Sequence, residues 1–582
     1  IPTVNGAIYF DESYVGNVIV YCGCIGLLPL KSFRRNAKPN DAIVLAGGKT
    51  GRDGIHGVTF ASAELTEKSE EISRPAVQIA NPIEEEKLKR AIIRIRDHGI
   101  ASAITDLGGG GLSSAVGETA KRFSCGAQVE LDKVPLKYAG LAPWEIYISE
   151  SQERMLLAVP PENLDKVLKI LADEDVEATA IGKYTDDKVL RIYYQGEKVA
   201  EIDVHFLFEP PKTVRKAECT PLGLKEPPIP EPKNIAEILL RLLSSPNIAS
   251  KESVIRTYDH EVKGNTVIKP LQGEYCGPND AAVLKPLENS WRGLAISCGM
   301  NPNYGKIDAY WMAASAIDEA IRNNLAVGGR RIALLDNFTW GNPEKPDRLG
   351  SLVMACKACY DFAKAFKTPF ISGKDSLYNE SPLGPVTPTL LITALGIIPD
   401  VRLSVSMDVK EPNNPIYIVG QTFQELGGSE YYRLHGFLGK NVPRVRPAQA
   451  KRTFRAIVKA IDLGLVEACH DLSEGGLGVA AAEMAFAGGY GMELHLNKVP
   501  RKNVKRNDYV LFSESNSRFL VEVSQEAKAE FEDLMDGKVY AEVGHVTKDP
   551  RLCIYGLNGE VTVDVPLKDL LASWKRTLSG GI

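Results

Sequence analysis

An aspartate and four consecutive glycines precede an expected helix in the sequence ITDLGGGGLSSAVGETA (104–120). Because a glycine-rich turn exposes backbone N–H groups and a helix N-terminus favours negative charge, such a turn can bind phosphate. Asp106 could add a carboxylate ligand for Mg²⁺, an ion that bridges to phosphate oxygens. The turn is neither a P-loop nor a G-x-G-x-x-G motif, because no GK[ST] follows and the glycines are contiguous. Taken alone, the pattern is equally typical of a tight structural turn.

Much of the chain is repeated. The phrase returns as CHDLSEGGLGVAAAEMA (469–485), which puts Asp471 365 residues after Asp106 (471 − 106). LDKVP is matched by LNKVP, SESQERMLLAV by SESNSRFLVEV, and IGKYTDDK by VGHVTKDP, in the same order and at nearly the same spacing. Because four blocks in one order do not arise from composition, we predict a duplicated domain of about 170 residues, within the usual domain size.

Shorter matches extend the repeat toward the N-terminus of each half. PTVNGAIYFDES (2–13) resembles PFISGKDSLYNES (369–381), and IGLLP resembles LGIIP. We therefore predict a small domain followed by a larger one in each half, with part of the first small domain expected upstream of Ile1. The predicted order is a remnant of the first small domain (1–37), the first large domain (38–208), a linker with a helix (209–257), the second small domain (258–410) and the second large domain (411–582).

Strands and helices alternate within each large domain, which predicts an α/β fold, with α+β small domains. DAIVLAGG (41–48) and IASAITDL (100–107) are short apolar segments typical of strands. The segment NPIEEEKLKRAIIRIRDHG (81–99) predicts a helix with Asn81 as its N-cap and Pro82 at its first position. In the proline-rich linker, Asn234 with Glu237 three residues later predicts another helix start.

The composition argues against several classes of protein. The net charge of −5 over 582 residues does not favour a nucleic-acid-binding surface. No run of about 18 apolar residues predicts a membrane span, and the first residues lack a signal-peptide pattern, so we expect a cytoplasmic protein. Ten scattered cysteines are too sparse for a disulfide framework. We expect Cys356 and Cys359 to be ordinary helix residues, and Cys22 and Cys24 to lie in a buried strand.

Four other polar clusters stand out: GGKTGRDGIHG (47–57), ESQ (150–152), Asp336 in LLDNFTWGNPEKP, and GKDS (373–376). The first could wrap a phosphate or form a flexible surface loop, and neither interpretation is favoured. The other three adjoin expected strands, where polar side chains of α/β domains often face ligands. Taken singly, each is more often a turn than a site.

Six segments together carry a family resemblance: GGKTGRDGIHGVTFAS, PAVQIANP, DLGGGGL, SESQERM, DNFTWGNPEKP and SGKDSLYNES. In this order they resemble phosphoribosylformylglycinamidine synthase, over essentially the whole chain. The resemblance implies a tandem aminoimidazole ribonucleotide synthetase-like fold with pseudo-twofold symmetry. It also implies ATP- and Mg²⁺-dependent amidation of formylglycinamide ribonucleotide in purine biosynthesis, in which ATP activates an amide oxygen and ammonia displaces phosphate. The repeated phrase would then mark two pseudo-equivalent phosphate sites, of which one is usually catalytic.

The resemblance also implies roles for individual residues. It implies substrate contacts at Gln78, Glu150, Ser151, Gln152 and Ser376, ATP contacts at Asp336 and Gly373, and a Mg²⁺ ligand at Asp106. Lys374 stands where many relatives carry a ligand asparagine. A protonated lysine cannot bind a metal, so a direct phosphate contact is the alternative. Asp471 is the counterpart of Asp106 in a second pseudo-site, which holds either a structural nucleotide or nothing.

Two features of the resembled family are absent from this sequence. The catalytic histidine of the family lies in an HNHP-type motif, and none of the eight histidines here does. We therefore expect that histidine upstream of Ile1. We also expect this chain by itself to be inactive or severely impaired, unless that segment is supplied. The sequence also contains no G-x-C-x-G nucleophile elbow for glutamine hydrolysis. Ammonia would then come from a separate glutaminase subunit, with a small bridging subunit as a second partner.

Two alternatives stay open at this point. Selenophosphate synthetase and thiamine monophosphate kinase belong to the same superfamily, but they have one small-plus-large unit, so the duplication weighs against them. A non-catalytic scaffold that only binds nucleotide is favoured by the absence of the HNHP motif. It is opposed by Gln78, Asp106 and the ESQ tripeptide, because a site without chemistry has no reason to keep that polar set.

Overall fold

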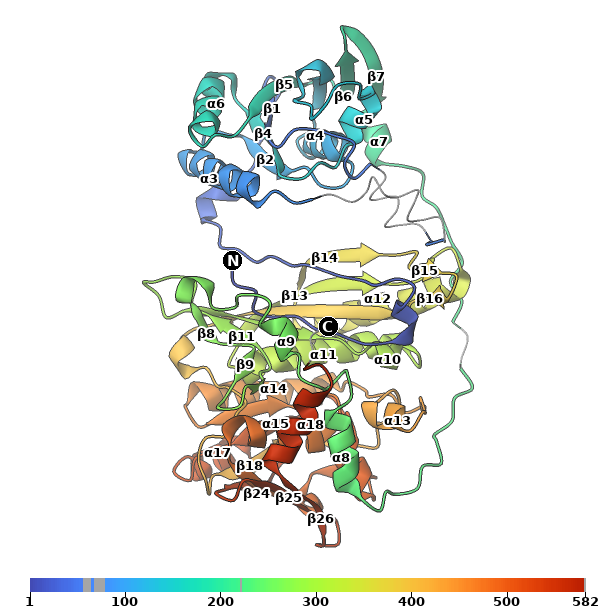
Figure 1. Cartoon of the computed structure of the whole chain (residues 1–582), viewed down its shortest axis with the longest axis vertical. Helices are drawn as coiled ribbons and strands as arrows, with labels where there is room; N and C mark the ends of the chain where they lie inside the picture. Colours follow the sequence, from blue (N-terminus) through green and yellow to red (C-terminus); the bar gives the residue numbers. More distant parts are fainter. Residues whose placement is uncertain (56–63, 67–78, 220–221, 580–582) are drawn as a thin grey trace. The chain divides into compact units, whose positions relative to one another are not determined.

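The computed structural model describes residues 1–55, 64–66, 79–219 and 222–579 (Figure 1). The chain divides into two compact units, one of residues Val20–Arg215 and one that joins Ile1–Ile19 to Lys216–Ile582. No helix among the described residues combines the length and the apolarity needed to cross a lipid bilayer.

The first unit is built on one mixed sheet of seven strands in the order β2-β4-β1-β5-β3-β6-β7. The strands are β1 (Ala42–Gly47), β2 (Ala103–Asp106), β3 (Gly126–Glu130), β4 (Arg154–Val159), β5 (Ala178–Thr185), β6 (Val189–Tyr194) and β7 (Glu197–Asp203). The α-helices are α3 (Pro82–His98), α4 (Gly111–Arg122), α5 (Pro143–Ile148), α6 (Leu164–Asp173) and α7 (Val204–Phe208).

Side-chain alternation along β1 explains why helices cover both faces of this sheet. Ile43 and Leu45 join the core that includes α4, whereas Val44 and Ala46 join the core formed with α3 and α6. Successive residues of a strand point to opposite faces, so a continuous apolar run needs cover on both sides. The result is a three-layer arrangement, and the α/β fold predicted from the sequence is confirmed.

The helix starts predicted from the sequence are confirmed. The Asn81 side chain accepts a hydrogen bond from Glu84 N, and Pro82 is the first residue of α3. The Asn234 side chain likewise accepts from Glu237 N at the start of α8. In both places a side-chain oxygen satisfies one of the backbone donors that the first helical turn leaves without a partner.

The second unit contains two larger sheets and several two-stranded ladders. One sheet has six strands in the order β14-β13-β17-β12-β11-β8, and the other has seven in the order β20-β23-β18-β24-β21-β25-β26. The strands are β8 (Thr266–Ile268), β9 (Leu271–Gln272), β10 (Gly277–Pro278), β11 (Ala282–Leu284), β12 (Gly293–Gly299), β13 (Arg330–Thr339), β14 (Phe370–Ser376), β15 (Glu380–Ser381), β16 (Gly384–Pro385), β17 (Thr389–Ile398), β18 (Pro415–Val419), β19 (Thr422–Phe423), β20 (Ala468–Asp471), β21 (Gly491–His495), β22 (Arg501–Lys502), β23 (Phe519–Glu522), β24 (Tyr540–Thr547), β25 (Arg551–Tyr555) and β26 (Val561–Pro566).

The helices of the second unit pack between and around these sheets. They are α8 (Ile235–Leu243), α9 (Glu252–Ile255), α10 (Pro302–Gly305), α11 (Ala309–Ala326), α12 (Pro346–Phe366), α13 (Glu430–Leu434), α14 (Pro447–Asp462), α15 (Gly476–Gly488), α16 (Asn507–Phe512), α17 (Lys528–Met535) and α18 (Leu567–Arg576). Helix α11 shares one apolar core with the six-stranded sheet and with β18 and β20 of the seven-stranded sheet, through residues such as Ile317, Leu334 and Tyr417. This shared core holds the two sheets of the unit together.

The predicted duplication is confirmed by the two seven-stranded sheets. Their strand orders match position by position when β2, β4, β1, β5, β3, β6 and β7 are replaced by β20, β23, β18, β24, β21, β25 and β26. Even a local irregularity is shared, because the ladder register shifts between Ile43 and Val44 in one sheet and between Ile416 and Tyr417 in the other.

In the N-terminal segment, the structure contradicts the prediction of a buried strand at Cys22 and Cys24. Residues 1–19 belong to the second unit, where Val4 packs with Ala282 and Leu284. Cys22 and Cys24 are both exposed, and the described residues around them form no strand. The prediction of a buried strand is wrong because apolar composition alone does not provide a neighbouring strand to pair with.

The prediction for the Cys-x-x-Cys pair, Cys356 and Cys359, is confirmed, since both cysteines lie within α12.

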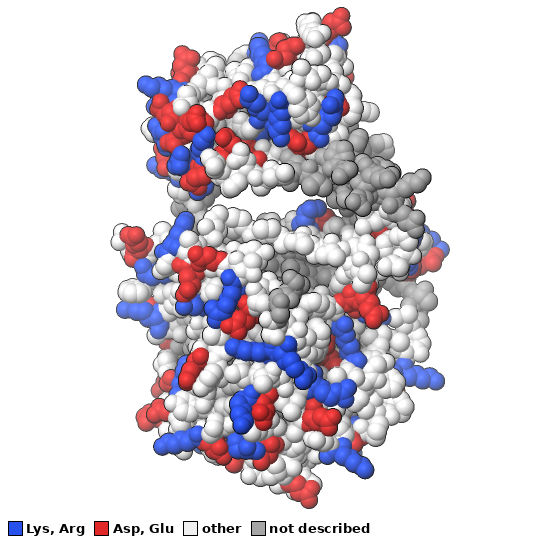
Figure 2. All heavy atoms as spheres, viewed as in Figure 1, with Lys and Arg blue, Asp and Glu red and all other residues white. Residues whose placement is uncertain are grey.

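Charges of both signs are interspersed over the face of the molecule that Figure 2 shows. On the first unit, for example, Arg90 pairs with Glu174 and Lys87 with Asp175, which joins α3 to the end of α6. Such exposed pairs contribute little to stability individually.

Candidate functional site

The glycine-rich turn of the first unit connects β2, which ends at Asp106, to α4, which begins at Gly111. Gly110 and Gly111 have φ angles of 76° and 54°, in the left-handed region that favours glycine. A Cβ atom on Gly111 would lie 1.9 Å from the Ser149 carbonyl oxygen. The glycines are therefore required for the turn to pass directly beside the loop that contains the ESQ tripeptide.

The ESQ loop is tied to this turn by hydrogen bonds. Gly110 N donates to Glu150 Oε1 at 3.0 Å, and Gln152 Nε2 donates to the Glu150 carbonyl oxygen at 2.9 Å. Ser151 Oγ accepts from Gly51 N at 3.0 Å, which adds the 47–53 loop to the same group. The structure thus brings Asp106, the ESQ tripeptide and the lysine- and arginine-containing loop together at one edge of the sheet.

The donor set of this turn suits Mg²⁺. The Asp106 carboxylate is exposed, and Glu150 of the adjoining ESQ loop supplies a second, half-buried carboxylate that accepts a hydrogen bond from Gly110 N. Carboxylate oxygens are the hard ligands that Mg²⁺ prefers, and the ion commonly keeps several waters and binds through one or two such groups. The residues present therefore fit a phosphate-bound Mg²⁺.

A second group of predicted residues lies on β13 and β14 of the other unit. Asp336 and Gly373 are partners in the parallel ladder. A Cβ on Gly373 would lie 1.8 Å from Asp336 Oδ1, so only glycine leaves room for that carboxylate. Burial, with a smaller contribution from Asp375, raises the pKa of Asp336. In this pair, the Asp336 carboxylate packs over the backbone of β14 at Gly373.

Two further residues of β14 complete this group. Lys374 is exposed and its ammonium donates to the Asp375 carbonyl oxygen at 2.6 Å. Ser376 Oγ donates to Asn379 Oδ1 at 3.2 Å. The remaining predicted substrate contact, Gln78, lies outside the residues that the structure describes.

The turn of the second half repeats the local geometry of the first. Gly475 and Gly476 have φ angles of 75° and 60°, and Gly475 N donates to Glu514 Oε1 at 2.9 Å. Asp471 ends β20 as Asp106 ends β2. The two glycine phrases of the sequence therefore fold into the same turn.

The surroundings of Asp471 differ from those of Asp106. Asp471 is buried, and Arg322 Nε from α11 donates to its Oδ2 at 2.9 Å. The same guanidinium pairs with Asp318, and its third nitrogen donates to Ser473 Oγ at 2.7 Å. Arg322 is fully buried, so these contacts form a desolvated ion-pair cluster that already provides Asp471 with a cation.

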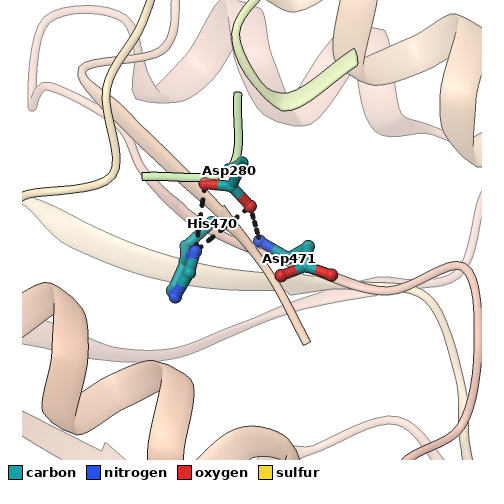
Figure 3. A group of neighbouring side chains, drawn as sticks. All are labelled: Asp280, His470 and Asp471. Atoms are coloured by element: carbon teal, nitrogen blue, oxygen red, sulfur yellow. Dashed lines mark hydrogen bonds and ion pairs between the residues drawn. The ribbon is translucent and has the colours of Figure 1, made fainter. Parts of the chain in front are cut away.

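His470 lies between the carboxylates of Asp280 and Glu483 beside this cluster. Figure 3 shows it with Asp280 and Asp471. Its Nδ1 lies 3.0 Å from Asp280 Oδ2 and its Nε2 lies 3.1 Å from Glu483 Oε2. Asp280, His470 and Asp471 are the donors within the described residues that come close enough to hold a metal ion. Burial alone lowers the pKa of His470, but Asp280 and Glu483 outweigh it and raise that pKa well above its usual range. Both ring nitrogens of His470 thus face buried carboxylate oxygens, one of Asp280 and one of Glu483.

Comparison with protein families gives the same division of the chain into repeated parts. The family model described as the C-terminal domain of AIR synthase related proteins matches twice, over residues 38–195 and 411–556. The model of the N-terminal domain of the same proteins matches residues 278–398.

Individual relatives extend this similarity along the chain. The phosphoribosylformylglycinamidine synthase subunit PurL of Thermoplasma volcanium is 37% identical over 100% of this chain and 76% of its own length. PurL of Thermococcus sibiricus is 40% identical over 94% of this chain and 75% of its own length. This chain belongs to the PurL family.

Solved PurL structures support the fold. Thermotoga maritima PurL complexed with FGAR superposes with a TM-score of 0.65 at 25% identity, covering 88% of this chain and 73% of that one. The same protein complexed with ATP gives a TM-score of 0.61 at 23% identity, covering 88% and 72%. The PurLQS structure from that organism gives 0.63 at 23% identity, again covering 88% and 72%. The family resemblance seen in the six sequence segments and the tandem AIR synthetase-like fold are both confirmed.

One residue pair in this PurL-family chain was missed by the sequence reasoning. Arg154 is almost fully buried at the start of β4, and Arg518 holds the equivalent place just before β23. Both follow the ESQ-type tripeptide of their repeat, in SESQERM and SESNSRF. The signal was present, because the arginine is common to both copies of a block that otherwise differs at several positions.

Proposed function

We propose that this chain is the synthetase subunit that converts formylglycinamide ribonucleotide to formylglycinamidine ribonucleotide in purine biosynthesis, with ATP, Mg²⁺ and ammonia. The observation that carries the proposal is the PurL similarity over the whole chain, together with a glycine turn that leaves Asp106 exposed beside the ESQ loop. The single-unit enzymes of the superfamily fit less well, because two seven-stranded sheets are present here.

The chemistry requires that ATP phosphorylate the amide oxygen of the substrate, with ADP leaving, and that ammonia then displace phosphate to form the C–N bond of the amidine. Backbone N–H groups of a glycine turn at a helix N-terminus stabilise negative charge of that kind. Mg²⁺, when bound, neutralises phosphate charge as a Lewis acid. In this proposal Asp106 holds the ion, and Glu150, Ser151 and Gln152, with Gln78, orient the ribonucleotide.

The β13–β14 group supplies the remaining contacts in this proposal. Gly373 and the Asp336 carboxylate that packs over it contact ATP. Ser376 contacts the phosphate of the ribonucleotide. Lys374, an exposed ammonium, contacts phosphate directly instead of binding metal.

We further propose that the turn at Asp471 is structural and does not bind phosphate. Arg322 already pairs with Asp471, and Gly475 and Gly476 are both buried. An anion entering this turn would have to displace a buried ion pair, which is costly.

Ammonia would reach this site from partner subunits. The sequence has no G-x-C-x-G elbow. One of the similar solved structures is described as PurLQS from Thermotoga maritima. We propose a glutaminase subunit and a small bridging subunit as the partners.

The test is a titration of the full chain with formylglycinamide ribonucleotide, followed by an assay with ATP, Mg²⁺ and ammonium chloride. The assay is repeated with the partner subunits and glutamine. We expect saturable binding of the ribonucleotide. Once the segment with the HNHP-type motif is supplied, we expect the assembled complex to form ADP in a reaction that requires both ribonucleotide and a nitrogen source. Binding of ATP without any binding of ribonucleotide would instead support the nucleotide-binding scaffold.

A further inference from the structure

A buried arginine makes the same three hydrogen bonds in each half of the molecule. In the first half, Arg154 donates through Nε to the Ser151 carbonyl oxygen at 2.7 Å and through Nη2 to the Ser149 carbonyl oxygen at 2.7 Å. Its Nη1 donates to Thr50 Oγ1 at 2.9 Å. One guanidinium thus joins both sides of the ESQ loop to the 47–53 loop.

The second half reproduces this arrangement atom for atom. Arg518 donates to the Ser515 carbonyl oxygen at 2.7 Å, to the Ser513 carbonyl oxygen at 2.6 Å and to Thr422 Oγ1 at 3.0 Å. The two copies keep this clamp although the loops that they join differ in sequence. The repetition shows that the arginine is part of the construction of the repeat.

The contacts of these arginines are unusual for a buried cation. All three acceptors are neutral oxygens, and burial lowers the pKa of each guanidinium to about 10. Burying a charge without a bonded carboxylate is expensive, so a neutral side chain would suit stability alone at least as well. What a guanidinium supplies is a rigid planar fork of donors, which sets the spacing and the angle between two loops.

The loops that Arg154 joins carry the proposed substrate contacts. Ser151 Oγ accepts from Gly51 N, and Glu150 N donates to the Asp53 carbonyl oxygen at 2.8 Å. Glu150 in turn accepts from Gly110 N of the glycine turn. A shift of the ESQ loop would therefore also move the 47–53 loop and the glycine turn, because both are hydrogen-bonded to it.

We infer that Arg154 is a positioning residue for ribonucleotide binding. It holds Glu150, Ser151 and Gln152 in the geometry that receives the substrate, without touching the substrate itself. This inference rests on the proposed function. Arg518 keeps the same clamp in the second half, where Arg322 pairs with the aspartate of the turn, and there it serves the fold alone.

The duplication provides a matched control inside one chain. The substitutions are Arg154→Lys and Thr50→Val in the first half, and Arg518→Lys and Thr422→Val in the second. Thr50 and Thr422 are both fully buried, so each valine removes one acceptor at nearly constant volume. For each variant of the full chain, the Tm and the Kd for formylglycinamide ribonucleotide are measured. KM and kcat are measured in the assembled complex.

We expect both members of each pair to lower the Tm by a similar amount. Only Arg154→Lys and Thr50→Val should raise the Kd and the KM for the ribonucleotide, by roughly tenfold to a hundredfold, since small displacements of positioning groups have effects of that size. The KM for ATP should change much less. A merely structural arginine would not move the ribonucleotide affinity selectively.

The inference is overturned if the first-half variants bind the ribonucleotide as tightly as their second-half counterparts do. It is also overturned if the second-half variants lose ribonucleotide affinity equally. The threonine pair decides the matter if either lysine variant fails to fold. If the wild-type chain does not bind the ribonucleotide at all, the proposed function fails first, and this result is distinct from equal affinities among the variants.

Discussion

The two glycine turns of this protein have the same backbone and opposite surroundings. Asp106 is exposed at the end of its strand, whereas Asp471 is only 6% exposed and is paired with Arg322 from a different domain of the repeat. Both turns bind their own ESQ-type glutamate through the same glycine N–H. Local sequence thus makes the turn, and the side chains delivered by neighbouring elements determine whether it remains open to a ligand.

The largest expected difference between the turns concerns their aspartates. Asp106→Asn should lower kcat/KM by about a thousandfold, since loss of metal-assisted charge stabilisation removes several kcal/mol from the transition state. Its stability should change little because the carboxylate is exposed. Asp471→Asn should do the opposite, with an unfolding free energy lower by about 3 kcal/mol and little loss of turnover. Steady-state kinetics and urea denaturation of the two variants measure both quantities.

The same two variants can also show that the catalytic and structural roles of the two turns are assigned the wrong way round. Turnover lost in Asp471→Asn and retained in Asp106→Asn would make the buried turn the catalytic one. Lys169→Ala, at an exposed position on α6, serves as the control for activity lost during preparation of the variants.

The second expected effect tests whether Arg322 takes the place that a bound cation would occupy beside Asp471. Arg322→Gln leaves the carboxylates of Asp318 and Asp471 buried without their partner, so the unfolding free energy should fall by roughly 3–5 kcal/mol. Millimolar Mg²⁺ should restore part of the lost Tm in this variant and have no such effect on the wild type. A variant as stable as the wild type without Mg²⁺ would show that the pair contributes nothing to holding α11 on β20.

The third effect uses pH to separate the two turns. Burial, followed by the charge of Glu474, raises the pKa of Glu514 to about 8. The folded state therefore keeps a proton that the unfolded state releases near pH 4.3, the usual value for a glutamate. Between about pH 5 and pH 8 the unfolding free energy should fall as pH rises, because the native state binds more protons than the unfolded state does.

Glu514→Gln should make the Tm less dependent on pH over that range. The counterpart Glu150→Gln is the matched substitution in the first turn. The ion pairs of His470 act in the same direction in every variant, since a histidine pKa raised by folding stabilises the native state below that pKa. Thermal melts at pH 6 and pH 8 give the slopes, and equal slopes for wild type and Glu514→Gln would refute the assignment.

The smallest effect on stability is expected at Lys374. Its side chain is exposed and bonds only a neighbouring carbonyl oxygen among the contacts that the structure shows, so Lys374→Ala should change the unfolding free energy by no more than about 0.5 kcal/mol. If it contacts phosphate, the KM for ribonucleotide or ATP should rise several-fold and become less sensitive to salt. An unchanged KM and salt dependence would exclude that contact.

Much of the architecture was available from repetition in the sequence. The 365-residue offset between Asp106 and Asp471 predicted two equivalent sheets, and the strand orders confirm it. Asparagine caps at positions 81 and 234 were predictable because capping depends on residues only three positions apart. The buried strand expected at Cys22 and Cys24 was wrong, since pairing depends on a neighbour that local sequence does not specify.

The candidate site divides in the same way. Asp106, the glycines and the ESQ tripeptide were recognisable because their chemistry and spacing are local or repeated. The domain boundaries, the partner subunits and the roles of all the predicted site residues, Asp106 and the ESQ tripeptide included, stay predictions. Arg154 escaped notice because its importance lies in contacts to Thr50, over a hundred residues earlier in the chain.

By itself, the sequence determined that this protein is a duplicated α/β chain with a glycine turn in each half. Turn geometry, helix caps and strand alternation depend on short-range sterics and hydrogen bonding, which a repeated phrase carries with it. Only the tertiary structure decided that the two turns differ in access, because the guanidinium that fills the second one comes from Arg322, 149 residues away from Asp471. A buried charge must be neutralised by whatever the fold brings within reach, and that depends on the packing of α11 against β20.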